Sequence, residues 1–397
     1  MLSVLFVTPY YAPAWEYGGI PRATYDLAQA LVSAGAEVFV VTTDAHTRYQ
    51  RVQALDKWVV EDDVKVFRIA NLSNRLVYRA GLPVPIGGMA ALHSALPSVD
   101  IIHLHGHRHL LNHIVVDILY RRKIPYVFSG HGSVPAIESK VTLKRIYDSL
   151  VGRRILDGAR LYIAVSNIEV LQLRAAGMKE PKIRKIYNPV PAPPEGLLSR
   201  RGFFRADWLI SQESPMVLFL GKITPRKGVD ILLRAFAKMR TPRARLVISG
   251  GALGQGLLPY KKMGESLGIS ERVIFTDHLA PSERFHALLD ADVLAYPSRD
   301  EIFGLAAAEA LLVGTPVVAS NDSGLAEILR LTGGARLVPY GDAEALAQSL
   351  DELLRDVSSL ELATEIVSAR EWILANLNPA TVAEQMLASY RDVLSQG

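Results

Sequence analysis

The sequence of 397 residues contains no cysteine. This absence excludes disulfide bonds, thiolate zinc sites, iron–sulfur clusters and a cysteine nucleophile, and it makes a reducing compartment the default expectation. The charges nearly balance, with 44 Lys and Arg against 40 Asp and Glu, so the net charge is only +4. So small an excess does not fit a protein that neutralises many phosphates, and we expect no nucleic-acid partner.

A long uninterrupted hydrophobic run is also missing. Pro9 and Pro13 interrupt the apolar N-terminus, which has neither the basic region nor the small-residue cleavage site of a signal peptide. The later apolar stretches contain prolines, glycines or Glu309, so we expect none of them to span a membrane. These features predict a cytoplasmic protein whose contact with a membrane is at most peripheral, on the inner face.

Apolar residues make up 49% of the chain, enough for a well-buried core. Short runs of β-branched residues alternate with segments of helical periodicity, which is typical of βαβ units and parallel sheets. A stretch rich in Pro, Gly and Ser at residues 188–215 separates two such patterns. We therefore predict an α/β fold with two Rossmann-like, doubly wound domains facing a cleft, at residues 1–190 and 200–378.

The segment 297–310 follows a predicted strand and opens an Ala-rich helix. Glu301 and Glu309 flank the start of that helix. The backbone N–H groups of Phe303, Gly304 and Leu305 would form an anion site, and glycine would allow a phosphate to approach closely. Alternatively, the first carboxylate only interacts favourably with the helix dipole and the second is a solvated helical residue.

A second segment, residues 221–228, also lies between a predicted strand and a predicted helix. Lys222, Arg226 and Lys227 make it a cationic loop flanked by glycines. Such a loop is suited to balancing the charge of a diphosphate that departs during a reaction. The alternative is that these basic side chains are merely solvated.

Two glycine-containing segments follow predicted strands in the N-terminal half. Gly18 and Gly19 would permit a ligand to approach the backbone at the start of the first helix, or they form a plain flexible turn. The segment lacks the G-x-G-x-x-G fingerprint, which removes the main support for a nicotinamide cofactor. His131 lies between two glycines and could hydrogen-bond a substrate hydroxyl or carbonyl, or only a turn.

Taken together, these four segments resemble glycosyltransferase family 4, retaining enzymes of the two-domain GT-B fold. The resemblance rests on the GG loop, His131, Asn188-Pro189, the G-K-x-x-x-x-K-G loop and the E-x-seven-E motif that ends at Glu309. It implies transfer of a sugar from a nucleotide-diphosphate sugar to a hydroxyl of a saccharide or lipid-linked saccharide, in cell-surface polysaccharide or glycolipid biosynthesis. It implies no metal or other cofactor, an acceptor-side first domain, a donor-binding second domain, and a C-terminal helix at 380–397 that joins the first.

The resemblance also implies a role for each matching residue. Glu309 would hold the ribose hydroxyls, Glu301 would lie near the donor sugar, and Lys222 and Lys227 would stabilise the leaving diphosphate. Members often have arginine where this chain has Lys222, which keeps the charge but loses the bidentate fork. The implied catalytic residues are His131, Lys222, Lys227 and Glu301. The implied substrate-binding residues are Gly18, Gly19, Arg226, Phe303, Gly304, Leu305 and Glu309.

Two other functions use similar sequence features. A sugar-nucleotide epimerase of the same fold would form product from the donor alone. A non-catalytic sugar-binding protein would bind its ligand without turnover, although the paired cationic and carboxylate loops argue against it.

Three further patterns allow more than one interpretation. Asp290 and Asp292 imitate the D-x-D metal motif, but their place at a helix end before an apolar strand favours a structural turn. The histidine cluster at residues 103–113 invites a metal site, but we favour a structural or cleft-lining role. The segment 140–156 mixes basic and apolar residues at helical spacing. It is either a packed helix with a solvated cationic face or a contact with anionic lipid.

Overall fold

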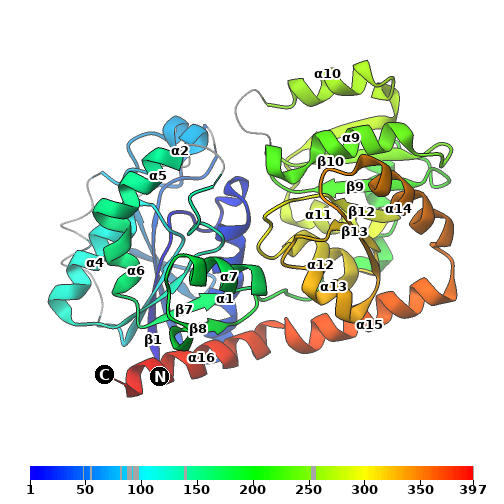
Figure 1. The fold of residues 1–397 in the computed structure, drawn as a ribbon. Coiled ribbons are helices and arrows are strands. Elements are labelled where there is room, and N and C mark those ends of the chain that lie inside the picture. Colours follow the sequence, from blue (N-terminus) through cyan, green and yellow to red (C-terminus); the bar gives the residue numbers. More distant parts are fainter. Residues whose placement is uncertain are drawn as a thin grey trace. The chain divides into compact units, whose positions relative to one another are not determined.

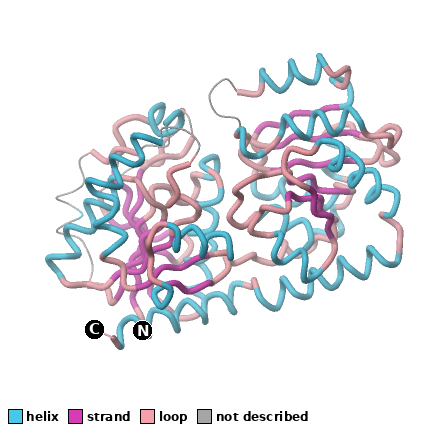
Figure 2. Tube along the Cα trace, viewed as in Figure 1, coloured by secondary structure: helices cyan, strands magenta, loops and turns pink. Residues whose placement is uncertain are grey.

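The computed structural model describes residues 1–47, 49–53, 56–80, 83–86, 92, 98–137, 141–251 and 256–396. The chain forms two compact units (Figure 1). Unit 1 combines Met1–Pro189 with Pro379–Gly397, and unit 2 is the continuous segment Val190–Asn378. In each unit the strands lie inside and helices cover them (Figure 2).

Unit 1 is built on an eight-stranded sheet with the order β3-β4-β2-β1-β5-β6-β7-β8. The strands are β1 (Ser3–Val7), β2 (Glu37–Thr43), β3 (Trp58–Glu61), β4 (Val64–Ile69), β5 (Ile101–His105), β6 (Tyr126–Ser129), β7 (Leu161–Ala164) and β8 (Ile183–Lys185). Strand β3 pairs antiparallel with β4, and the other described pairs in this sheet are parallel. The central strands β1 and β5 are buried along almost their whole length, as expected for strands covered on both faces.

The helices of unit 1 cover both faces of this sheet. They are α1 (Gly19–Ser33), α2 (Asn74–Ala80), α4 (Leu110–Arg122), α5 (Val141–Tyr147), α6 (Arg153–Asp157), α7 (Asn167–Ala175) and α16 (Pro379–Ser395). Helix α16 packs beside α1 (Figure 1), where it buries Met386 and Tyr390 in the core on that face. A second core on the opposite face includes Phe67 and Phe128.

Unit 2 has a six-stranded parallel sheet with the order β11-β10-β9-β12-β13-β14. The strands are β9 (Met216–Leu220), β10 (Arg245–Ser249), β11 (Val273–Asp277), β12 (Val293–Tyr296), β13 (Val317–Ser320) and β14 (Ala335–Val338). The helices are α8 (Phe203–Asp207), α9 (Val229–Lys238), α10 (Leu258–Ser266), α11 (Pro281–Asp290), α12 (Leu305–Leu312), α13 (Ala326–Thr332), α14 (Ala343–Asp356) and α15 (Leu360–Asn376). The predicted α/β class with two Rossmann-like, parallel-sheet domains is therefore confirmed.

Among its parallel strands, each sheet reverses its strand order at one place, where the predicted site loops begin. In unit 1 the order reverses between β1 and β5, and in unit 2 between β9 and β12. Loops that leave the carboxyl ends of two such strands run to opposite faces of the sheet and leave a crevice between them. The four segments singled out in the sequence follow β1, β6, β9 and β12.

The structure differs from the sequence-based expectations in two segments. The stretch predicted to separate the two domains belongs to unit 2 from Val190 onward, and its helix α8 packs against α11 of that unit. Asp290 accepts hydrogen bonds from the backbone N–H groups of Gly202 and Arg205, and Asp292 pairs with the Arg205 side chain. The aspartates of the D-x-D sequence thus have a structural role.

The expected single helix at 140–156 is three elements. Helices α5 and α6 are separated by one turn of π-helix at Asp148–Gly152, called η2 below. Lys140 lies outside the described residues. The wider turn brings the Asp148 carboxylate to His107 and Arg108, which follow β5.

Candidate active site

The predicted site residues of unit 2 lie on two loops at the reversal between β9 and β12. Gly228 brings these loops into contact, because its φ is +68° and a Cβ there would lie 2.2 Å from the carbonyl oxygen of Pro297. The backbone N–H of Arg299 donates to the carbonyl of Arg226 at 2.9 Å. The cationic loop and the loop that carries Glu301 are therefore joined along their backbones.

Lys227 and Glu301 form the central ion pair of this site. The Lys227 ammonium donates to Glu301 Oε2 and, at 3.1 Å, to the Tyr296 hydroxyl. Both charged side chains are mostly buried, with 13% and 17% of their surfaces exposed. The ion pair raises the pKa of Lys227 and lowers that of Glu301, in each case against the effect of desolvation, so both groups are charged. Burial raises the pKa of Tyr296 to about 12, which keeps its hydroxyl neutral.

Helix α12 begins at the end of the same loop. Gly304 caps its N-terminus with φ +92°, a conformation that glycine adopts at little cost. A Cβ at Gly304 would lie 3.3 Å from the Tyr296 ring, which leaves little room for a side chain. The first N–H groups of a helix have no acceptor within the helix, which applies in α12 to Leu305 and the residues directly after it. Phe303, which precedes the cap, is buried.

Glu309 lies one turn further along α12 and is only 1% exposed. Its Oε1 atom accepts a hydrogen bond from Arg284 Nη2 of α11 at 2.6 Å, whereas its buried Oε2 atom has no hydrogen-bond partner in the structure. Leaving a buried acceptor unpaired costs about 1–3 kcal/mol. The alternative of a solvated helical glutamate is therefore wrong, and Oε2 is an acceptor that a ligand hydroxyl would satisfy.

Lys222 and Arg226 complete the cationic loop. Lys222 comes two residues after β9 and is half-buried, and the next backbone N–H, of Ile223, donates to the Gly251 carbonyl. The Arg226 guanidinium lies 3.5 Å from the carbonyl oxygen of Asp300. Unit 2 thus carries seven of the predicted residues on these two loops and at the first residue of α12: Lys222, Arg226, Lys227, Glu301, Phe303, Gly304 and Leu305. Glu309 lies on the same helix as the last of these.

In unit 1 the predicted residues lie on loops after β1 and β6. Helix α1 begins at Gly19, and Gly18 precedes it with φ +103°. His131 has a left-handed backbone with φ +48°, and its Nε2 atom lies 3.1 Å from Nδ1 of His105. Desolvation lowers the pKa of His131 to about 4, so the imidazole is neutral at pH 7.

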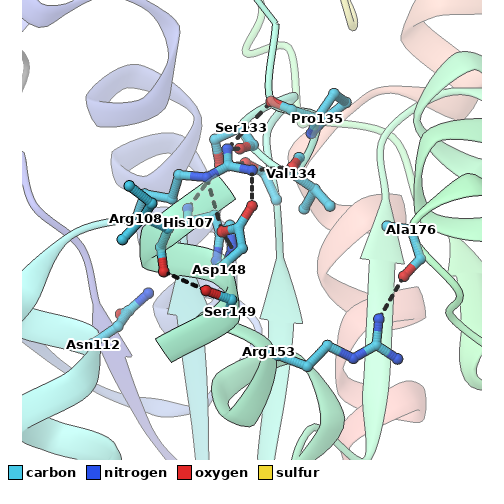
Figure 3. A network of polar contacts seen from close by, with 12 residues as sticks. His107, Arg108, Asn112, Ser133, Val134, Pro135, Asp148, Ser149, Arg153 and Ala176 are labelled. Carbon is cyan, nitrogen blue, oxygen red and sulfur yellow. Dashed lines mark hydrogen bonds and ion pairs between the residues drawn. The ribbon is translucent and has the colours of Figure 1, made fainter. Parts of the chain in front are cut away.

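The histidine cluster is part of the hydrogen-bonding framework of unit 1. His103 lies 2.7 Å from both the Tyr390 hydroxyl and Ser129 Oγ, and His109 donates to the carbonyl of His105. His107 contacts Asp148, whose carboxylate also pairs with Arg108 (Figure 3). Within the described part of the chain, no three His, Asp or Glu side chains are grouped to hold a metal ion.

Three residues of these surroundings were not identified from the sequence. Tyr296 shares Lys227 with Glu301, Arg284 contacts Glu309, and Glu169 of α7 accepts a hydrogen bond from the backbone of Gly132. Each acts across two elements that are distant in sequence, so neither spacing nor periodicity identifies it. For Glu169 the S-x-x-E spacing after Ser166 was a signal of a helix start, but not of a contact with the His131 turn.

Two family descriptions match the chain. Residues 18–189 match the Glycosyl transferase 4-like domain, and residues 200–369 match Glycosyl transferases group 1. The chain belongs to glycosyltransferase family 4. The resemblance drawn from the sequence motifs is therefore confirmed.

This glycosyltransferase is similar to proteins described as D-inositol 3-phosphate glycosyltransferase. The one from Mycobacterium marinum is 38% identical over 188 residues, which cover 45% of this chain and 38% of the relative. The one from Corynebacterium glutamicum is 34% identical over 196 residues, which cover 47% of this chain and 45% of the relative. The chain thus matches less than half the length of these curated relatives.

Solved structures share the fold over nearly the whole chain. Sucrose-phosphate synthase from Thermosynechococcus elongatus has a TM-score of 0.76 at 21% identity, covering 100% of both chains. HepE from Anabaena, solved in complex with UDP, has a TM-score of 0.76 at 19% identity, covering 98% of this chain and 100% of its own. At these identities the likeness establishes the GT-B fold of this glycosyltransferase.

Proposed function

We propose that this protein transfers a sugar from a nucleotide-diphosphate sugar to a hydroxyl group of a saccharide or lipid-linked saccharide. The observation that carries the proposal is the Lys227–Glu301 ion pair at the strand-order reversal of unit 2. It joins a cationic loop to the N-terminus of α12, and both features stabilise phosphate charge. The name of the relatives and the UDP complex of HepE support a nucleotide-sugar donor.

The proposed roles follow the chemistry of each group. The unpaired Oε2 of Glu309 would accept hydrogen bonds from the ribose hydroxyls. Lys222, Arg226 and Lys227 would stabilise the diphosphate, together with the N–H groups at residues 303–305. Gly18 and Gly19 would leave room for phosphate at the start of α1. His131, neutral at pH 7, would hydrogen-bond the sugar near the reacting carbon.

We further propose that the configuration at the anomeric carbon is retained and that no metal takes part. The best-placed carboxylate, Glu301, is engaged by Lys227, which lowers its nucleophilicity. A same-face displacement, in which the leaving phosphate helps to deprotonate the acceptor, therefore fits this site better than a covalent intermediate. Trapping a glycosyl-enzyme on Glu301 would refute this mechanism, and the anomeric configuration of the product can be measured by NMR. The place in cell-surface polysaccharide or glycolipid biosynthesis rests on the family resemblance.

The first test is ligand-dependent thermal stability against UDP-, GDP-, ADP- and dTDP-sugars, with chelator and then with magnesium. A ligand at about 100 times its Kd stabilises the folded state by about 2.7 kcal/mol, which raises Tm by several degrees. We expect one nucleotide series to give this shift without metal, and Glu309→Ala to abolish it. Glu365→Ala, which removes a carboxylate paired with Arg336 elsewhere in unit 2, is the matched control.

Turnover then distinguishes transfer from the related reactions. Product that forms only with an acceptor supports transfer, whereas product from the donor alone would favour an epimerase. The absence of a thermal shift with every nucleotide sugar would contradict the proposal itself.

We also propose that unit 1 contacts anionic lipid through α5 and η2. Leu143, Ile146 and Leu150 are 59%, 49% and 75% exposed, at spacings of three and four residues, and α5 has no buried residue. Arg145 and Arg154 are exposed nearby. Apolar side chains flanked by cations are the pattern of a helix that lies in a lipid interface.

Among the described residues, no helix has both the length and the hydropathy to cross a bilayer.

Vesicle sedimentation tests the lipid contact. Leu150→Ser is expected to reduce binding to vesicles containing anionic lipid, and high salt should reduce it further because the cations contribute. Leu171→Ser removes a leucine of α7 that is 61% exposed and serves as the control. Sedimentation that is equal for both variants, or equal with neutral and anionic vesicles, would contradict the lipid contact.

A further inference from the structure

The turn that carries His131 is attached to a buried carboxylate of α7. Glu169 is 1% exposed. Its Oε1 atom accepts a hydrogen bond from the Gly132 N–H at 2.8 Å, and its Oε2 atom accepts one from the Val165 N–H at 2.9 Å. One side chain thus links the end of β7 to the residue directly after His131.

The shape of the turn requires such support. His131 and Gly132 are both left-handed, with φ of +48° and +74°. For histidine this conformation is uncommon, costs about 1–3 kcal/mol and persists only where the surroundings enforce it. Gly130 fits against the carboxylate, since a Cβ there would lie 3.1 Å from Glu169 Oε1 and 2.9 Å from Val134 Cγ2.

The residues after His131 are held from the other side. Arg108 reaches across to the carbonyl groups of Ser133, Val134 and Pro135, and Asp148 fixes its guanidinium (Figure 3). The Arg108 guanidinium therefore binds the carbonyl groups of residues 133–135 in this loop, whereas the Glu169 carboxylate binds the N–H group of Gly132, directly after His131. The imidazole itself lies beside His105.

We propose that Glu169 is a positioning residue for His131: its carboxylate holds the Gly132 N–H and thereby fixes the direction in which the imidazole presents itself to substrate. The inference rests on the proposed function, because it assigns His131 a role toward the transferred sugar. Glu169 itself touches no substrate in this scheme.

The protonation state of Glu169 supplies a readout of its contact with the His131 turn. Desolvation raises its pKa to about 7, against the effect of its two hydrogen bonds. The groups around the turn do not titrate there. Burial lowers the pKa values of His131, of its neighbour His105, and of His103 and His109 beyond it. His107 also has a lowered pKa, and so does Asp148, which is paired with Arg108.

The test compares Glu169→Gln with Glu180→Gln, which changes an exposed glutamate of the same unit. The amide that replaces the Glu169 carboxylate offers one acceptor oxygen to two backbone donors, so one hydrogen bond is lost. We measure the ring signals of His131 by NMR from about pH 5 to pH 9, a range that brackets this titration. The signals are assigned with a His131→Gln variant. We expect an inflection near pH 7 in the wild type and in Glu180→Gln, and its loss in Glu169→Gln.

Turnover is the second readout. Misplacement of a reacting contact by about 1 Å can cost a hundredfold, so we expect Glu169→Gln to lower kcat by about tenfold to a hundredfold. The KM for the donor should stay within about twofold, because the charged groups proposed to bind the nucleotide diphosphate lie in unit 2 and are unchanged. If the wild type turns over no nucleotide sugar, the proposed function fails, and the NMR signature still decides whether Glu169 positions His131.

A second variant guards against misfolding of the first. In Gly130→Ala the new Cβ displaces the turn relative to Glu169, but the carboxylate is kept. The His131 signals should therefore shift, while the inflection near pH 7 persists. A folded Glu169→Gln protein with unchanged His131 signals and unchanged kcat would overturn the inference. Unchanged signals in Gly130→Ala would overturn it as well.

Discussion

Lys227 and Glu301 stabilise the folded protein through the pairing of their two charges. Removing one member of a mostly buried ion pair leaves the other charge without compensation, which costs about 3–5 kcal/mol. We expect Lys227→Met to lower the free energy of unfolding by about 3 kcal/mol, somewhat less than a fully buried pair, because each side chain keeps some exposure. Urea unfolding monitored by circular dichroism measures this loss.

The double variant Lys227→Met/Glu301→Gln provides the control for that prediction. It removes both charges, so most of the lost stability should return although the proposed activity does not. A double variant as unstable as Lys227→Met alone would mean that packing against Tyr296, and not the charge on Glu301, accounts for the loss.

Glu169 gives the stability of the protein a pH dependence of a particular sign. Its pKa is about 7 in the folded state against 4.5 ordinarily, so between these values the folded state binds more protons than the unfolded state. Its contribution to stability is therefore full below about pH 4.5 and is lost as pH rises to about 7. The difference amounts to at most about 3–4 kcal/mol, at 1.36 kcal/mol for each pKa unit.

The buried histidines act in the opposite direction. The pKa values of His131 and His109 fall to about 4, so their contribution is full above about pH 6.5 and is lost as pH falls toward 4. The term from Glu169 is isolated by subtraction of the unfolding free energies of Glu169→Gln from those of the wild type at each pH. A difference that does not change between about pH 4.5 and pH 7 would contradict the raised pKa.

At the scale of elements, the sequence predicted the central strands of the two sheets better than the strands at their edges. Strands such as β1 and β9 are continuous apolar runs, so they were identifiable. Strand β3 is hard to predict from the sequence, because Trp58–Glu61 is short and half-exposed and pairs antiparallel at the sheet edge. Strand β14 is hard to predict as well, because Ala335–Val338 follows two glycines and is itself partly exposed.

The candidate site shows the same division. Glycines and charges in loops after strands could be predicted, because the ends of parallel strands meet at one edge of a sheet. The contacts of Glu309 with Arg284 and of Gly132 with Glu169 could not, because each joins elements whose relative placement is decided by packing. The π-helical turn η2 is a third case, since helical periodicity does not reveal one extra residue in a turn.

The π-helical turn leads to a prediction in which two effects oppose each other. Helix propensity alone makes Gly152→Ala stabilising by about 1 kcal/mol. However, the new Cβ would lie 2.8 Å from Asp148 Oδ1 and 3.1 Å from the His107 ring, and Arg108 keeps the aspartate from moving away (Figure 3). Overpacking costs about 1–3 kcal/mol, so we expect a net loss of stability in urea unfolding.

Gly264→Ala in α10 is the matched control. Its Cβ would meet only Ser270 Oγ, at an ordinary 3.8 Å. Propensity should decide there, with a gain of about 0.5–1 kcal/mol. A stabilising Gly152→Ala would show that η2 can relax and that Asp148 is not fixed by its partners.

At the scale of the whole molecule, the two units differ in the number of chain segments that form them. Unit 2 is one continuous segment, whereas unit 1 is assembled from Met1–Pro189 and the distant Pro379–Gly397. Helix α16 fills part of the core of unit 1 with Met386, Leu387 and Tyr390, and the Tyr390 hydroxyl lies 2.7 Å from Nδ1 of His103. His103 in turn lies beside His105, the neighbour of His131, so the helix supports the interior on which the proposed site of unit 1 is built.

This difference predicts distinct behaviour of two fragments. A fragment of residues 190–378 retains every element of unit 2 and should unfold cooperatively. A fragment of residues 1–189 loses the buried side chains of α16, each of which contributes about 1.5–3 kcal/mol. Their sum is comparable with the whole stability of a domain, about 5–15 kcal/mol, so this fragment should lack a cooperative transition in calorimetry.

Adding a peptide of residues 379–397 should restore the transition, and a peptide with Tyr390→Ala should restore less. A cooperative transition in the fragment 1–189 alone would show that α16 only lies against a core that is already complete.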